Sequence, residues 1–236
     1  MSAHQPRRPA GTPTGGQFAG LSRPEPGYSL EPDPPGGVAL VPSPTRAARS
    51  WSGRAAIDER PVEPEIVVLS DGCRGERYYR DGRLHDPDDG RPAVVWYRPD
   101  GGVESEVHYR DGKCHDPADG GPALVAYRPD GAVEREVHYR DGECQDPDDG
   151  RPAVVRYRGD GAVDSVEHYR GDELHDPDDG SPAVVRYRAD GSVSRQWHYR
   201  GDELQDPDDG SPAVVRYRAD GTVESVEHWQ QGEQLD

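Results

Sequence analysis

The chain of 236 residues contains only 35 Leu, Ile, Val and Phe residues, about 15%, and carries a formal net charge of −18. This combination is typical of a disordered chain, although a repeat array folds with few apolar residues because each unit covers its neighbours. The charge argues against nucleic acid as a partner, since phosphate neutralisation needs a basic surface. No apolar run is long enough to span a membrane and the N-terminus lacks a signal-peptide core, so we expect a cytoplasmic protein without a membrane partner.

Residues 1–63 come first in the chain and are rich in Pro and Gly, with almost no periodic apolar signal. This composition predicts a disordered tail. The stretch Pro9–Ala19 resembles an N-terminal segment of many actinobacterial proteins, which implies a bacterial source. Two interpretations of the tail stay open: a flexible segment, or a short docking motif anchored by Phe18, the only Phe of the chain.

Residues 64–236 form the second region, which is built from repeats. A degenerate first unit begins at Pro64, and five full units of 30 residues follow. The stretch Asp86–Gly101 returns from Asp116, Asp146, Asp176 and Asp206 with its prolines in strict register. Such a period predicts a repeat array. We therefore expect an all-β fold, an elongated and curved single-sheet meander of antiparallel hairpins.

The turn Arg98-Pro99-Asp100-Gly101 sets the expected register of each long hairpin. Pro suits the first turn centre and Gly the position of positive φ, which favours a type I turn with a G1 bulge and pairs Tyr97 with Val103. Alternate strand residues share a face. Counting by twos, the predicted inner face carries Ala93, Val95, Tyr97, Val103, Ser105, Val107 and Tyr109, and the outer face carries Val94, Trp96, Arg98, Glu104, Glu106 and His108.

The same register makes predictions for the later copies. It sets Arg156 opposite Asp164, Arg216 opposite Glu224, Val154 opposite Val166 and Val214 opposite Val226. Opposite charges and apolar residues would then meet across the strands, as pairing energies favour. Glu167 and Glu227 fall on the inner face, which predicts a layer that is wet in places.

A second, shorter turn follows each long hairpin. Asp111-Gly112 suits a type I′ turn, and Gly171-Asp172 in a later copy suits a type II′ turn. Either turn would pair Tyr109 with Cys114 and His108 with His115. Cys114 and its equivalent Cys144 occupy the slot that Leu84, Leu174 and Leu204 fill in other copies, so we expect buried, reduced thiols that act as small hydrophobes.

The spacing of the Tyr, Gly and Asp residues in the repeat resembles that of a known family. The segment Tyr109–His115, followed by Gly121 and by Ala123–Tyr127 up to Asp130-Gly131, is similar to MORN-type repeats, and more closely to the MORN-repeat-variant family. The resemblance implies an extended antiparallel sheet that binds proteins or sometimes lipid, and some members of that family are described as antitoxins. The acidity favours a protein partner here, because anionic membranes attract Lys and Arg clusters.

The acidic loop of each repeat is a candidate calcium site. Calcium takes six to eight oxygen ligands, so one loop would need help from a neighbouring loop. The alternative is a Pro- and Asp-directed turn whose charges keep the loop solvated. The candidate ligands are Asp86, Asp88, Asp89, Asp146, Asp148, Asp149, Asp176, Asp178, Asp179, Asp206, Asp208 and Asp209, with Asp116 and Asp119 in the second loop.

Two histidine pairs, His108 with His115 and His168 with His175, are candidates for a transition metal, which would want further ligands. The alternative is an exposed hydrogen-bonding ladder, which the Gln at alternate copies favours.

Catalysis needs one asymmetric site, whereas every acidic group here recurs in each unit. The sequence also lacks a phosphate-binding Gly loop and a nucleophile elbow. We therefore expect a non-enzymatic, cofactor-free protein-interaction scaffold, antitoxin- or immunity-like, with an ion-binding structural array as the alternative. The oligomeric state stays open.

Overall fold

The computed structural model describes residues 63–235, which form only strands, turns and loops. The chain divides into two compact units, one ending at Val154 and the other beginning at Val155. In each unit the strands follow one another as antiparallel hairpins, which confirms the predicted all-β hairpin array. The disordered tail was predicted for residues that, except for Glu63, lie outside the described part. The curvature and overall length of the array stay predictions.

The first unit contains three long hairpins. Its main strands are β1 (Glu65–Val68), β2 (Arg74–Arg77), β5 (Val94–Tyr97), β6 (Val103–Val107), β9 (Leu124–Tyr127) and β10 (Val133–Val137), paired in that order. Three short hairpins come from β3 (Tyr79–Arg80) with β4 (Arg83–Leu84), β7 (Tyr109–Arg110) with β8 (Lys113–Cys114), and β11 (Tyr139–Arg140) with β12 (Glu143–Cys144).

The second unit repeats the same plan. Its main strands are β13 (Val154–Tyr157), which begins at the boundary, β14 (Val163–Glu167), β17 (Val184–Tyr187), β18 (Val193–Trp197), β21 (Val214–Tyr217) and β22 (Val223–Glu227). Its short hairpins are β15 (Tyr169–Arg170) with β16 (Glu173–Leu174), β19 (Tyr199–Arg200) with β20 (Glu203–Leu204), and β23 (Trp229–Gln230) with β24 (Glu233–Gln234).

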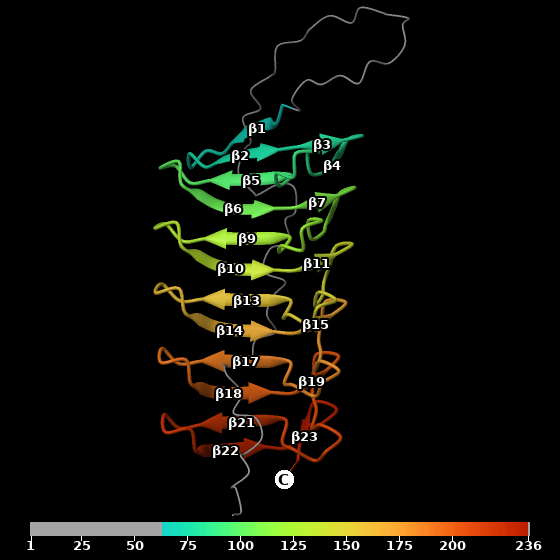
Figure 1. The fold of residues 1–236 in the computed structure, drawn as a ribbon, viewed down its shortest axis with the longest axis vertical. Coiled ribbons are helices and arrows are strands. Elements are labelled where there is room, and N and C mark those ends of the chain that lie inside the picture. The colour runs from blue at the N-terminus through green and yellow to red at the C-terminus, as the bar shows by residue number, and fades with distance from the viewer. Residues whose placement is uncertain (1–62, 236) are drawn as a thin grey trace, which may run out of the picture. The chain divides into compact units, whose positions relative to one another are not determined.

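The short hairpins lie beyond one end of the main strands, where each follows its long hairpin directly (Figure 1). Successive short hairpins are also joined to one another by backbone hydrogen bonds. The Gly112 amide donates to the Leu84 carbonyl over 2.8 Å, and the Gly142 amide donates to the Cys114 carbonyl over 2.9 Å. Two parallel sets of contacts therefore connect neighbouring repeats.

The turn of the long hairpin is as predicted. The Gly101 amide donates to the Arg98 carbonyl over 2.9 Å, the Arg98 amide donates to the Gly102 carbonyl over 2.8 Å, and Gly101 has φ of 89°. Tyr97 pairs with Val103. The Asp100 carboxylate accepts the Gly102 amide over 2.9 Å, which fixes the turn further.

The short turns are all of one type. Asp111 and Gly112 have φ of 52° and 85°, the two positive values of the predicted type I′ turn. Gly171 and Asp172 have φ of 60° and 65°, so the predicted type II′ turn is wrong. Asp tolerates the left-handed region, and the Gly-Asp order therefore adopts the same turn as the Asp-Gly order.

Beyond the turn, a second irregularity shifts the register of the long hairpin. Tyr97 pairs with Val103, but Trp96 pairs with Ser105 and Val94 with Val107, so Glu104 is an extra residue. In the later hairpins the pairing register shifts by the same one residue between Arg186 and Tyr187 and between Arg216 and Tyr217. A bulge of one residue reverses the alternation of every side chain that follows it on the strand.

The bulge makes the counted register wrong. Arg216 lies opposite Ser225, and Val214 lies opposite Glu227, not opposite Glu224 and Val226. Two copies earlier, Arg156 forms its ion pair with Glu167, whereas Asp164 contacts Arg158 and Arg186.

The bulge also redistributes the faces of the sheet. Val94, Trp96, Ser105 and Val107 share one face, so Val107 and Ser105 were placed correctly with the core but Val94 and Trp96 were wrongly assigned to the outer face. Val95 and Tyr97, predicted to be inner residues, lie on the opposite face with Glu106.

The core fills the space between the main sheet and the short hairpins. In the second unit, Leu174 and Leu204 from the short hairpins pack with Val184, Trp197 and Val214 from the main strands. The prediction of buried thiols in the same slot is confirmed for Cys144, which is 8% exposed, and all three cysteines are reduced. Cys114 is half-buried, and burial raises the pKa of its thiol.

We expect the Leu204→Ala variant to lower the free energy of unfolding by about 3 kcal/mol, because a buried Leu leaves a cavity when truncated. Leu204 is 6% exposed, whereas Leu235 is 47% exposed. The matched control Leu235→Ala should cost less than about 0.5 kcal/mol. Urea unfolding followed by circular dichroism measures both, and equal losses would contradict the assignment of the core.

Candidate functional site

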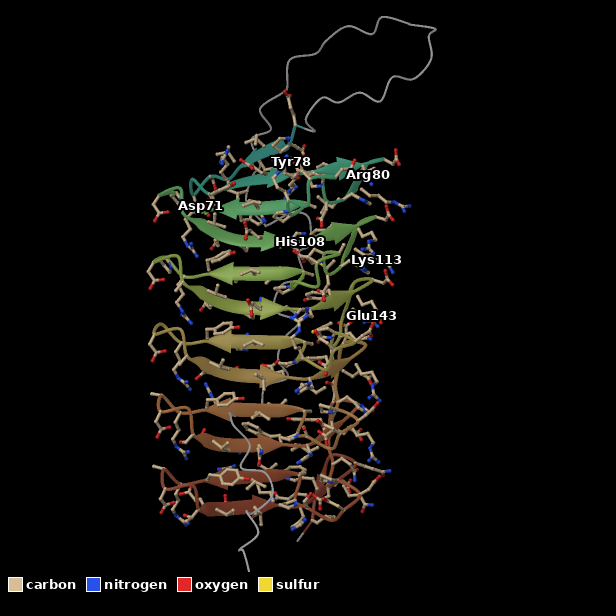
Figure 2. All side chains as sticks on the ribbon, in the orientation of Figure 1. Asp71, Tyr78, Arg80, His108, Lys113 and Glu143 are labelled. Carbon is tan, nitrogen blue, oxygen red and sulfur yellow. The ribbon has the colours of Figure 1, made fainter. Side chains whose placement is uncertain are left out.

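The first aspartate of each acidic loop points inward, not into solvent. One oxygen of Asp86 accepts the backbone amides of Ala93 and Tyr109 over 2.8 and 2.9 Å, and the other lies 2.7 Å from Nδ1 of His108. An ionised carboxylate only accepts, so the His108 ring donates through Nδ1. His108 lies between the main strands and the short hairpins, which carry Arg80 and Lys113 (Figure 2). One carboxylate therefore joins its own loop to the hairpin of the next repeat.

This Asp–His bond recurs along the chain in both units. The carboxylate to Nδ1 distance is 2.6 Å for Asp116 with His138, for Asp176 with His198 and for Asp206 with His228. In each case the same aspartate also accepts the amide of the residue after the histidine over 2.9 Å. His138 and His198 are 4% and 9% exposed, so these two pairs lie within the fold, whereas the side chain of His228 is 46% exposed.

A backbone bond closes the connection from the other side. The amide of His108 donates to the carbonyl of Ala123 over 2.7 Å, and the amide of Ala123 donates to Asp116 over 2.9 Å. Ala123 and its equivalents have no exposed surface. The alanine after each proline is thus bonded on one side to its own loop and on the other to the preceding repeat.

The electrostatics of this site are clearest at Asp206. Burial raises the pKa of this carboxyl, but hydrogen bonds from the Trp229 amide, the His228 ring and the Ala213 amide outweigh that effect, and the pKa lies below its ordinary value. The carboxylate is therefore held in its charged form by donors from two repeats.

The other loop carboxylates serve different purposes. Asp148 is exposed and lies 2.7 Å from the guanidinium of Arg140, as Asp178 does from Arg170. The third aspartate of each loop accepts the amide two residues ahead, as Asp179 does from Ser181 over 2.9 Å. The hydrogen bonds from Ser181 lower the pKa of Asp179.

The three predicted calcium ligands of each loop therefore point toward separate partners. Among residues 63–235, no group of three or more His, Cys, Asp or Glu side chains is arranged to hold a metal ion. The calcium site stays a prediction from the repetition of the loop, with no added geometric support.

The predicted histidine pairs also have divided roles. His108 bonds Asp86, while Nδ1 of His115 accepts the Asp141 amide over 3.2 Å. His175 lies in the same slot as His115, and its Nε2 is 3.1 Å from Arg170. His168 occupies the slot of His108 and is half-buried. The transition-metal pairs stay predictions as well.

The alternation of His and Gln now has a structural explanation. Nδ1 of His85 accepts the Asp111 amide over 3.1 Å, and in a later copy the side-chain oxygen of Gln205 accepts the Gln231 amide over 2.9 Å. Either residue offers the acceptor that the next short turn needs. Gln therefore replaces His in this slot without loss of the contact.

Sequence reasoning missed the Asp–His bond, although a signal was present. His108, His138, His168, His198 and His228 recur without exception, each 22 residues after the first aspartate of a loop. This constant spacing of 22 residues is the signal in the sequence, whereas the second histidine slot holds Gln in some copies.

No protein-family model matches this chain, and no curated protein matches it significantly. The described residues include no helix, and hence none that is long and apolar enough to cross a membrane.

We expect Asp176→Asn to lower the free energy of unfolding by about 2–3 kcal/mol, because it weakens a charge-assisted bond and disturbs two buried amide contacts. The matched control is Asp178→Asn in the same loop, where the side chain is 93% exposed. Its ion pair should be worth less than about 1 kcal/mol. Chemical denaturation of both variants measures the difference, and similar losses would show that the inward aspartate is not special.

The lowered pKa of Asp206 predicts acid sensitivity. Its contribution to stability is fully present above the unfolded pKa of about 3.9 and is lost as pH falls through the lower folded value. The gap in unfolding free energy between the wild type and Asp206→Asn should therefore shrink below pH about 4. Denaturant titrations across the acid range measure this gap, and a constant gap down to pH about 2 would refute the assignment.

Proposed function

We propose that the protein is a non-enzymatic, cytoplasmic scaffold that binds another protein through the face of the sheet that carries a tyrosine from each repeat. We call this the tyrosine face and define it by Tyr97 and Tyr127 in the first unit and Tyr187 and Tyr217 in the second. The observation that carries the proposal is that each unit presents half-buried tyrosines at the same position of successive repeats.

The tyrosines are held in fixed positions by the strands beside them. The Tyr127 hydroxyl donates to Glu106 over 2.6 Å, and the Tyr217 hydroxyl donates to Gln196 over 2.6 Å. Burial, with the neighbouring Glu106, raises the pKa of Tyr127, so its hydroxyl keeps its proton at neutral pH. A rigid aromatic ring with a polar tip suits a protein interface, where Tyr is enriched.

The spacing of the row follows from the repeat. Each repeat contributes two main strands, and strands lie about 4.8 Å apart, so tyrosines within a unit recur about every 10 Å. The partner should present an extended surface with a basic character, because the chain carries a net charge of −18 and complementary charge speeds association.

The repeated Asp–His bond supports a structural rather than a catalytic role. An Asp–His pair orients a general base in some enzymes, but here the pair recurs in copy after copy and joins each repeat to the next. Catalysis needs one asymmetric arrangement. The resemblance to MORN-repeat variants supports the same class of function and includes antitoxin- or immunity-like binding, in which the partner is a toxic protein.

We expect the Tyr187→Ala, Tyr217→Ala double variant to bind the partner at least about tenfold more weakly, since central aromatic anchors carry about 2 kcal/mol or more each. The immobilised full chain is used to capture partners, which are identified by mass spectrometry and then titrated in purified form. Arg170→Ala, on a short hairpin whose arginine is 55% exposed, is the matched control.

Binding that the double variant retains, or a wild-type chain that captures no partner, would contradict the proposal. Circular dichroism must show that the variant keeps its strands. Co-expression of the chain with the gene of the identified partner distinguishes the two forms of the proposal. An antitoxin restores the growth that a toxic partner stops, whereas a scaffold has no such effect.

A further inference from the structure

The opposite face of the second unit carries a row of three arginines on neighbouring strands. Arg186 pairs directly with Arg195, and Arg195 pairs directly with Arg216 on its other side. Arg195 therefore stands between two like charges. Like charges placed opposite one another across strands are destabilising, and this chain is otherwise strongly acidic.

The repeats themselves provide the comparison. In the first unit the same three positions are Trp96, Ser105 and Ala126, which pair in the same order. Serine also occupies the position of Arg195 in two other copies, as Ser165 and Ser225. Arginine also occupies these positions as Arg135 and Arg156. Because serine and alanine stand there in other copies, the frame of the sheet does not need arginine at these positions.

Trp197 supports the central arginine. It is 4% exposed, and the guanidinium carbon of Arg195 lies 4.6 Å from the centroid of its ring. A cation–π contact of this kind holds the planar group in place. Burial and the adjacent charge of Arg216 lower the pKa of Arg195, although Glu227 and Tyr199 act in the opposite direction. Arg195 thus lies in a partly desolvated, positive environment.

Two carboxylates contact the outer arginines of the row. Arg186 contacts Asp164 at 3.4 Å, and Arg216 contacts Glu227 at 2.8 Å. Both arginines remain about two-fifths exposed at the side chain, at 38% and 41%. Nε of Arg216 is buried and donates no hydrogen bond to another described group. Arg186 and Arg216 therefore keep part of each side chain in solvent, where an anion in solution reaches them.

We propose that Arg186, Arg195 and Arg216 form an oxyanion-binding site, which takes a phosphate or carboxylate group. The arginine fork matches such groups with two parallel hydrogen bonds, and an anion between the guanidiniums turns a repulsive row into an attractive one. The site lies on the opposite face from Tyr187 and Tyr217 and does not rest on the protein-binding proposal.

The test is calorimetric titration of the full chain with inorganic phosphate and with a blocked oligoglutamate peptide, at matched ionic strength. Arg195→Ser reproduces the serine of other copies, and Arg195→Gln keeps the side-chain stem over Trp197 if the serine variant does not fold. Arg200→Ser, which removes an exposed arginine from a short hairpin of the same unit, is the control for loss of charge.

We expect the wild type and Arg200→Ser to bind at least one probe, and the Arg195 variants to bind it at least about tenfold more weakly. Binding of phosphate alone supports a site for a free oxyanion, and binding of the peptide supports a carboxylate supplied by a partner. Absence of binding to both probes, or equal binding by the Arg195 variants and the wild type, overturns the proposal.

Discussion

The carboxylate of Asp176 bonds the Ala183 amide of its own repeat and, at the same time, the Tyr199 amide and the His198 ring of the next. A buried polar group costs free energy unless it finds partners, and this one finds them only when two repeats are in register. The bond therefore makes each repeat depend on its neighbour. In a chain with so few large apolar residues, such contacts supply part of the interface energy that a repeat array needs.

The few apolar residues of each repeat are concentrated beside this connection. The extra residue in the hairpin of β17 and β18 brings Val184 and Trp197 onto one face with Val214, where the short hairpins cover them with Leu174 and Leu204. In the second unit this arrangement builds a core of two layers, where the short hairpins cover the main strands. The remainder of each main strand is free to carry other side chains.

The main sheet of the second unit therefore has two different faces. One continues from the core into arginines such as Arg195, and the other carries Tyr187 and Tyr217. Most backbone bonds recur from repeat to repeat, while the side chains on these faces vary more between copies. The tyrosines recur from copy to copy, whereas the residues at the arginine positions differ between copies.

The sequence by itself determined the fold class, the boundaries of the hairpins, the turn at Gly101 and the slot of Cys144, because prolines, glycines and the 30-residue period act locally. It did not determine the face of each strand residue, since a single extra residue, Glu104, reverses the alternation without a distinctive signal. The partners of Asp86 and His108 were likewise decided by tertiary structure, because a separation of 22 positions in the chain gives no distance in space until the next repeat has stacked.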